Sequence, residues 1–238
     1  FYGLAEVTVG GRSCVISQTG FSGESGYEIY LRNATLYADD MWDAVLEAGK
    51  KHNLMVIAPA HHRRIQAGIL SWGQDLDHEH NPFQCNLGYQ VSLSGKGEWA
   101  KKGDYVGKQA LEKMKADLKD GHKPYKLQLV GFEIGGKPID EYAPDFWLVS
   151  PGDGGDPCGF ITSPWYHPEK GKNIAMGYIP YDGTLNSNGF PKWELGKKYK
   201  VHLPDIYADE PGVPVDAVTV DVPFTESFNA NTREVVKG

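Results

Sequence analysis

The spacing of apolar and polar residues changes along the chain, and this spacing predicts where strands and helices lie. Near the N-terminus, two short apolar runs, "AEVTV" and "RSCVIS", flank Gly10-Gly11. A Gly-Gly pair between two such runs is a strong signal for a β-hairpin with a two-residue loop. The following run, "YEIYL", alternates and predicts a strand with Tyr27, Ile29 and Leu31 on one face. The beginning of the chain is therefore predicted to form strands.

Three later stretches have the three- and four-residue spacing of amphipathic helices. The first covers residues 35–48 and ends at Gly49, a natural helix stop. The second is predicted to start near Pro59 and to carry "AHHRRIQAGIL". The third covers residues 108–118 and has many lysines on its outer face. We expect each helix to place one face in a core and its charged face in solvent.

The composition changes after "KDGHKPYK", where the helical periodicity ends. Short strand-like runs follow, separated by clusters of Gly, Pro, Asp and Asn: "LQLVGFEI", "DFWLVS", "CGFITS", "NIAMGYI", "KKYKVHL" and "DAVTVDV". Several short strands at such spacing favour an all-β barrel or sandwich. The sequence therefore predicts an α+β protein with a mixed region over residues 1–122 and a β-barrel domain over residues 123–238.

Composition and charge exclude several classes of protein. The 238 residues are 40% hydrophobic and 23% charged, as in ordinary globular domains, and their net charge of -7 argues against a nucleic-acid partner. No run approaches 18 consecutive apolar residues, and the N-terminus has no signal-peptide pattern, so we expect no membrane partner. The three cysteines form no C-x-x-C pair, which argues against a zinc site and a disulfide framework and fits a cytoplasmic location.

The stretch "TGFSGESGYEIYL" places one acid, Glu24, in a glycine-rich turn ahead of a strand. Glycines allow a ligand to approach the backbone closely. A carboxylate only accepts hydrogen bonds and can take two parallel donors at once, such as the amine and ring N–H of a pterin or guanine edge. The residues alone leave two alternatives open, a ligand contact and an acid exposed on a hairpin turn.

Two other clusters carry possible chemistry. His78 and His80 with Asp75 or Asp77 could bind a metal, but one short loop seldom supplies a whole coordination shell, and a polar surface loop is the alternative. "HHRR" (residues 61–64) could contact an anion or could form a solvated basic helix face. Neither a G-x-S-x-G nucleophile motif nor a phosphate-binding glycine loop is present.

Six stretches, in order along nearly the whole chain, resemble the tetrahydrofolate-dependent aminomethyltransferase family, whose prototype is the T-protein of the glycine cleavage system. "TGFSGESGYEIY" is similar to the family's T-G-Y-T-G-E-D-G-x-E-I turn, and "RRIQAGILSWGQDLD" to its R-L-E-A-G-x-x-L-Y-G-x-D segment. The other four are "WDAVLEAG", "NPFQCNLGYQV", "DYVGKQAL" and "GFITSPWYHPEKGKNIAMGYI". No single motif is decisive, but six in this order are specific.

The resemblance implies that residues 1–122 are the C-terminal part of a larger α/β pterin-binding domain and that the family's C-terminal β-barrel follows. It places Glu24, Arg64 and Trp72 at positions that bind tetrahydrofolate. The family's catalytic aspartate lies N-terminal to the segment present here. No catalytic residue is therefore assigned, and we expect the isolated chain to have little transferase activity.

Departures from the T-protein pattern bear on the reaction. The family has the pattern A-R-D-x-L-R, and its first Arg falls on Ala60 and its Asp on His61 in this chain. The Glu of the family's R-L-E-A-G segment is replaced by Gln66. The first hypothesis is therefore a demethylase that moves a methyl group from a small donor to tetrahydrofolate, as aryl O-demethylases and dimethylsulfoniopropionate demethylases do. The alternatives are a glycine cleavage aminomethyltransferase, which needs a lipoylated carrier protein, and a non-catalytic folate-binding module.

Overall fold

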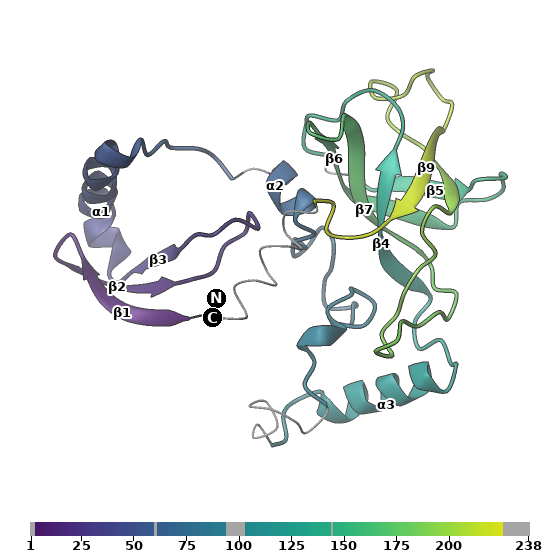
Figure 1. The fold of residues 1–238 in the computed structure, drawn as a ribbon, viewed down its shortest axis with the longest axis horizontal. Helices are drawn as coiled ribbons and strands as arrows, with labels where there is room; N and C mark the ends of the chain where they lie inside the picture. Colours follow the sequence, from purple (N-terminus) through teal and green to yellow (C-terminus); the bar gives the residue numbers. More distant parts are fainter. Residues whose placement is uncertain (1–2, 60, 94–102, 144, 226–238) are drawn as a thin grey trace.

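The computed structural model describes residues 3–59, 61–93, 103–143 and 145–225, and these residues form a small N-terminal sheet with one helix and a larger C-terminal barrel (Figure 1). The segment that carries α2 (His61–Gln66) lies between them. The fold class predicted from the sequence, mixed helix and strand with a C-terminal β-barrel, is confirmed.

The N-terminal sheet has the order β1 (Leu4–Val9), β2 (Arg12–Ser17) and β3 (Glu28–Leu31), and all its pairs are antiparallel. The predicted hairpin is confirmed, because Val9 pairs with Arg12 and both loop glycines have positive φ angles, 54° at Gly10 and 79° at Gly11. Two consecutive positive φ angles match a turn that favours glycine.

The first predicted helix is confirmed as α1 (Ala34–Gly49). Its apolar stripe is covered only in part, since Met41 is the one residue of α1 that is buried and Trp42 is 54% exposed. The expectation that one whole face of this helix lies in a core is therefore wrong for the described residues. A three-stranded sheet is too small to cover the stripe.

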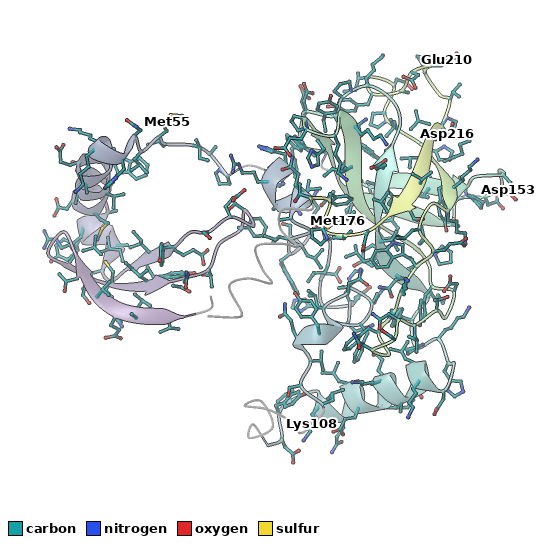
Figure 2. The ribbon with its side chains drawn as sticks, viewed as in Figure 1. Met55, Lys108, Asp153, Met176, Glu210 and Asp216 are labelled. Atoms are coloured by element: carbon teal, nitrogen blue, oxygen red, sulfur yellow. The ribbon has the colours of Figure 1, made fainter. Side chains whose placement is uncertain are left out.

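The second predicted helix is much shorter than its sequence pattern suggested. After η1 (Lys50–His52), residues 53–59 have no regular structure, and Met55 is 77% exposed (Figure 2). α2 then ends at Gln66 rather than near Leu70, because Gly68 has a φ of 68°. A left-handed residue turns the chain out of the helix, and glycine adopts it at no steric cost.

The third predicted helix is confirmed as α3 (Lys108–Lys119). Together with the loop that contains η2 (Gly88–Gln90), it packs below the barrel in the view of Figure 1. Leu118 of α3 joins Phe83 and Tyr181 in a small buried cluster, so this helix is attached to the barrel by apolar contacts.

The C-terminal barrel is closed and antiparallel, with the strand order β4-β7-β6-β5-β8-β9. The strands are β4 (Leu127–Ile134), β5 (Trp147–Pro151), β6 (Gly159–His167), β7 (Lys172–Pro180), β8 (Lys198–Val201) and β9 (Val215–Val220). Each of the six predicted strand-like runs contributes one strand. Phe132, Val149 and Ile161 belong to the main barrel core.

A second apolar cluster joins the barrel to α2. It combines Ile65 of α2 with Leu129, Ile174 and Met176 of the barrel strands, and Met176 is labelled in Figure 2. Burying such side chains stabilises the contact by roughly 1.5–3 kcal/mol each. Within the described residues, no helix combines the length and the apolar character that crossing a membrane requires.

Candidate functional site

Glu24 lies in the loop between β2 and β3, and the turn predicted around it is present. The Glu24 backbone N–H donates to Ser22 Oγ at 3.3 Å, and Gly23 has a φ of 77°. At the base of the loop the Thr19 hydroxyl donates to the Glu28 carboxylate. These contacts hold the loop while leaving the Glu24 side chain 63% exposed, so its carboxylate is accessible to a ligand.

Glu24 faces a cavity of about 240 Å³ that three segments of the chain form together. The glycine-rich loop supplies one side, α2 the second and the turn between β6 and β7 the third. The residues that line the cavity are Ser22, Glu24, His62, Arg63, Gln66, Pro168 and Glu169. The cavity is therefore a junction of the N-terminal loop, α2 and the barrel, and it is polar.

The charges around this cavity are only loosely paired. Arg63 Nη1 lies 4.0 Å from Glu24 Oε1, and the two side chains are 47% and 63% exposed, so the ion pair contributes at most about 1 kcal/mol. Partial burial, together with the nearby Arg63, lowers the pKa of His62. The lowered pKa favours the uncharged imidazole, which can donate or accept a hydrogen bond.

Arg64, the next residue of α2, is wholly buried and fully hydrogen-bonded. Its Nη1 donates to Asp75 Oδ2 at 2.8 Å and to the Ile69 carbonyl at 3.0 Å. Its Nη2 donates to Gln74 Oε1 and to Ser163 Oγ, both at 2.9 Å, while Nε donates to His61 Nδ1 at 3.3 Å. All five N–H groups of the guanidinium have partners within the chain, so none is left for a ligand in this arrangement.

The partner of Arg64, Asp75, is bonded to the barrel as well. The hydroxyls of Thr162 and Ser163, both in β6, donate to Asp75 Oδ1, with Ser163 at 2.6 Å. Tyr178 of β7 donates to the Asp75 carbonyl at 2.6 Å. A buried ion pair is stable only when its remaining hydrogen-bonding groups are satisfied in this way. The network therefore fixes α2 on the outside of the barrel.

Of the three residues predicted to bind tetrahydrofolate, Glu24 is the one that lines this cavity. Arg64 is buried and Trp72 has 61% of its surface exposed, and neither is among the lining residues. The Trp72 ring makes an edge contact with His78, at 4.8 Å between ring centroids.

The acids and histidines of residues 75–80 contact other side chains of the protein. His80 Nδ1 lies 2.7 Å from Asp77 Oδ1, and Asp75 is occupied by Arg64. Over the described ranges, no group of three or more His, Cys, Asp or Glu side chains is placed to hold a metal ion.

Sequence reasoning missed several residues that line the cavity. Pro168 and Glu169 are in the motif "GFITSPWYHPEKGKNIAMGYI", but nothing local to them indicates a site. Gln66 stood out as a departure from the family pattern, and Arg63 belonged to the "HHRR" cluster that left an anion contact open. Only the fold, which brings these segments together, shows that Arg63 and Gln66 line the cavity.

Comparison with known proteins gives three findings. The family described as "GCVT N-terminal domain" matches residues 1–95. The chain is 30% identical over 181 residues to an aminomethyltransferase of Caldanaerobacter subterraneus subsp. tengcongensis, a match that covers 75% of this chain and 43% of that protein. An aminomethyltransferase of Symbiobacterium thermophilum is 33% identical over 179 residues, which are 73% of this chain and 42% of that protein.

The solved structure of the glycine cleavage system aminomethyltransferase T from Bartonella henselae has a similar fold. The TM-score is 0.61 at 20% identity, over 90% of this chain and 50% of that one. The chain spans less than half the length of the two relatives above. Residues 1–95 match the family model and three quarters of the sequence match aminomethyltransferases, so the chain is similar to the folate-dependent aminomethyltransferase family. The likeness to the solved structure shows that it shares the fold.

Proposed function

We propose that this chain is the tetrahydrofolate-binding portion of an aminomethyltransferase, which moves an aminomethyl group from a lipoylated carrier protein to tetrahydrofolate. The observation that carries the proposal is the exposed Glu24 carboxylate in a polar cavity at the junction of loop, α2 and barrel. The names of the matched relatives favour aminomethyl transfer over the demethylation that the sequence departures suggested.

The residues present fit the proposed ligand. A pterin ring presents an amine beside a ring N–H, and Glu24 offers two acceptor oxygens. Among the described residues, the ion-pair contact of this carboxylate is Arg63 Nη1 at 4.0 Å. The cavity of about 240 Å³ has room for a ring system and not for the whole ligand. Bound tetrahydrofolate would supply a nucleophilic ring nitrogen, and the chain would hold its ring in a fixed orientation.

In this proposal Arg64 and Trp72 have different parts. Arg64 holds α2 in place through Asp75 and so positions the residues that line the cavity. Trp72 has an exposed indole face that can stack on an aromatic portion of the ligand beyond the pterin. No catalytic acid or base is assigned among the residues that line the cavity.

The test is a product assay on the full-length protein. With tetrahydrofolate and an aminomethyl-loaded lipoyl carrier, we expect methylenetetrahydrofolate and ammonia. With methyl ethers, sulfonium compounds and methylamines as donors, we expect no 5-methyl-tetrahydrofolate. Formation of the methyl product alone would overturn the proposal in favour of a demethylase.

Glu24→Gln provides the residue-level check. It removes the charge but keeps the size, so tetrahydrofolate binding should weaken by about 1.5–3 kcal/mol, the cost of losing a charged acceptor from a buried donor pair. Glu47→Gln, an exposed acid at the end of α1 paired with Lys50, is the matched control and should bind as the wild type does. Calorimetric titration measures both variants, and equal affinities of Glu24→Gln and wild type would contradict the Glu24 contact.

A further inference from the structure

Two consecutive arginines of α2 differ completely in what they contact. The side chain of Arg64 is 1% exposed and all its donors are used. The side chain of Arg63 is 47% exposed, and within the described residues its ion-pair contact is the 4.0 Å approach to Glu24. A separation of 4.0 Å is too long for a hydrogen bond, so the guanidinium keeps its donors available beside the Glu24 carboxylate.

Arg63 and Glu24 form a donor and an acceptor side by side on one cavity. A carboxylate only accepts hydrogen bonds and a guanidinium only donates them. A ligand that fits both must therefore present a hydrogen-bond donor and an acceptor next to each other, as the N–H and C=O groups on one edge of a pterin do. Gln66, which also lines the cavity, carries an amide that can donate or accept, so it does not impose this choice.

The sequence also differs from the family pattern at Arg63. The T-protein pattern A-R-D-x-L-R has its first arginine at Ala60 and a leucine at Arg63. This chain therefore lacks one family arginine and has gained another three positions later. Arg63 lies in α2, whereas Ala60 lies outside the described residues.

We propose that Arg63 determines the specificity of the cavity for a 4-oxo pteridine over its 4-amino counterpart, by donating to the carbonyl oxygen beside the N–H groups that Glu24 accepts. This inference rests on the proposed function. A 4-amino ring places an amine at the position of that carbonyl, so two donors would oppose each other at Arg63. A site built to donate a hydrogen bond disfavours an analogue that lacks the acceptor, because its own donor is then left unpaired.

The experiment compares two ligands on the full-length protein by calorimetric titration: tetrahydrofolate and its 4-amino analogue. Arg63→Leu should weaken tetrahydrofolate binding by about tenfold or more and shift the preference between the two ligands toward the 4-amino analogue by a similar factor. Arg63→Lys should keep part of the preference, because it retains a donor. Arg32→Leu removes an exposed arginine paired with Glu6 in the N-terminal sheet and should leave both affinities unchanged.

The outcomes separate this inference from the proposed function. Suppose that tetrahydrofolate binds, that Glu24→Gln weakens the binding of both ligands, and that Arg63→Leu leaves the ratio of the two affinities at the wild-type value. The role of Arg63 is then wrong, and the proposed function stands. If the wild type binds neither ligand, both are overturned. Thermal unfolding of each variant provides a second measurement, and Arg63→Leu should unfold at the wild-type temperature because its side chain is half exposed.

Discussion

At the residue scale, Arg63 is accessible and Arg64 is buried because they lie on different sides of α2. The side that carries Arg64 and Ile65 packs against the barrel, where both residues are buried. The side that carries Arg63 and Gln66 faces the cavity. Neighbouring residues on a helix point about 100° apart, so one basic pair supplies both a structural and an accessible arginine.

Arg64→Met should lower the free energy of unfolding by about 3–5 kcal/mol, since it leaves the Asp75 carboxylate buried without its cation. Arg63→Met is the matched variant one position away and should change that free energy by no more than about 0.5 kcal/mol. Urea denaturation of both variants measures the difference. Similar losses in the two would mean that the buried ion pair does not form.

At the element scale, β6 and β7 carry the contact with α2, and two glycines allow these strands to lie close together. A Cβ on Gly177 would lie 2.6 Å from the Phe160 carbonyl oxygen, and one on Gly159 would lie 2.0 Å from the Tyr178 carbonyl oxygen. Both clashes involve backbone atoms, which cannot move aside without disturbing the strand pair. The irregular register of β6 and β7 between Ile161 and Ser163 lies in the same region.

Gly177→Ala should therefore destabilise the barrel by roughly 1–3 kcal/mol, as overpacking does in a filled core. Gly3→Ala is the control, because a Cβ there would meet nothing within 4 Å. Circular dichroism during urea unfolding reports both midpoints. A wild-type unfolding midpoint for Gly177→Ala would contradict the expected clash and show that β6 and β7 can move apart to accommodate the methyl group.

At the scale of the whole molecule, the contacts of α2 bear on how the chain divides. We propose the division predicted from the sequence, residues 1–122 and 123–238, as the division into domains. Yet Arg64, Asp75 and Ser163 bond α2 and its following loop to β6. We therefore expect α2 to open together with the barrel, although it precedes the proposed boundary.

Hydrogen exchange followed by mass spectrometry tests this expectation. Amides of α2 should be protected to the same degree as those of β6 and more than those of β1–β3, because local opening follows the buried contacts that a segment makes. Ser163→Ala removes a partner of both Arg64 and Asp75 and should lower protection in α2 and β6 while leaving β1–β3 unchanged. Protection of α2 that follows β1–β3 would contradict this view.

The sequence by itself determined those features that depend on neighbours along the chain. The Gly10-Gly11 hairpin, the spans of α1 and α3 and the six barrel strands follow from local spacing and turn residues, and the structure has them nearly as predicted. The order of six motifs also indicated the resemblance to the family. The length of α2 was misjudged, because the apolar pattern continues beyond Gly68 although the backbone leaves the helix there.

Only the tertiary structure decided which residues share the site. Arg64 and Ser163 are 99 positions apart, and the glycine-rich loop meets α2 and Glu169 through contacts that no local pattern encodes. Whether an arginine is buried and paired or accessible depends on which side of its helix faces the barrel. The barrel side of α2 is fixed by the apolar packing of Ile65 and by the Asp75 hydroxyl partners, so the accessible role falls to Arg63.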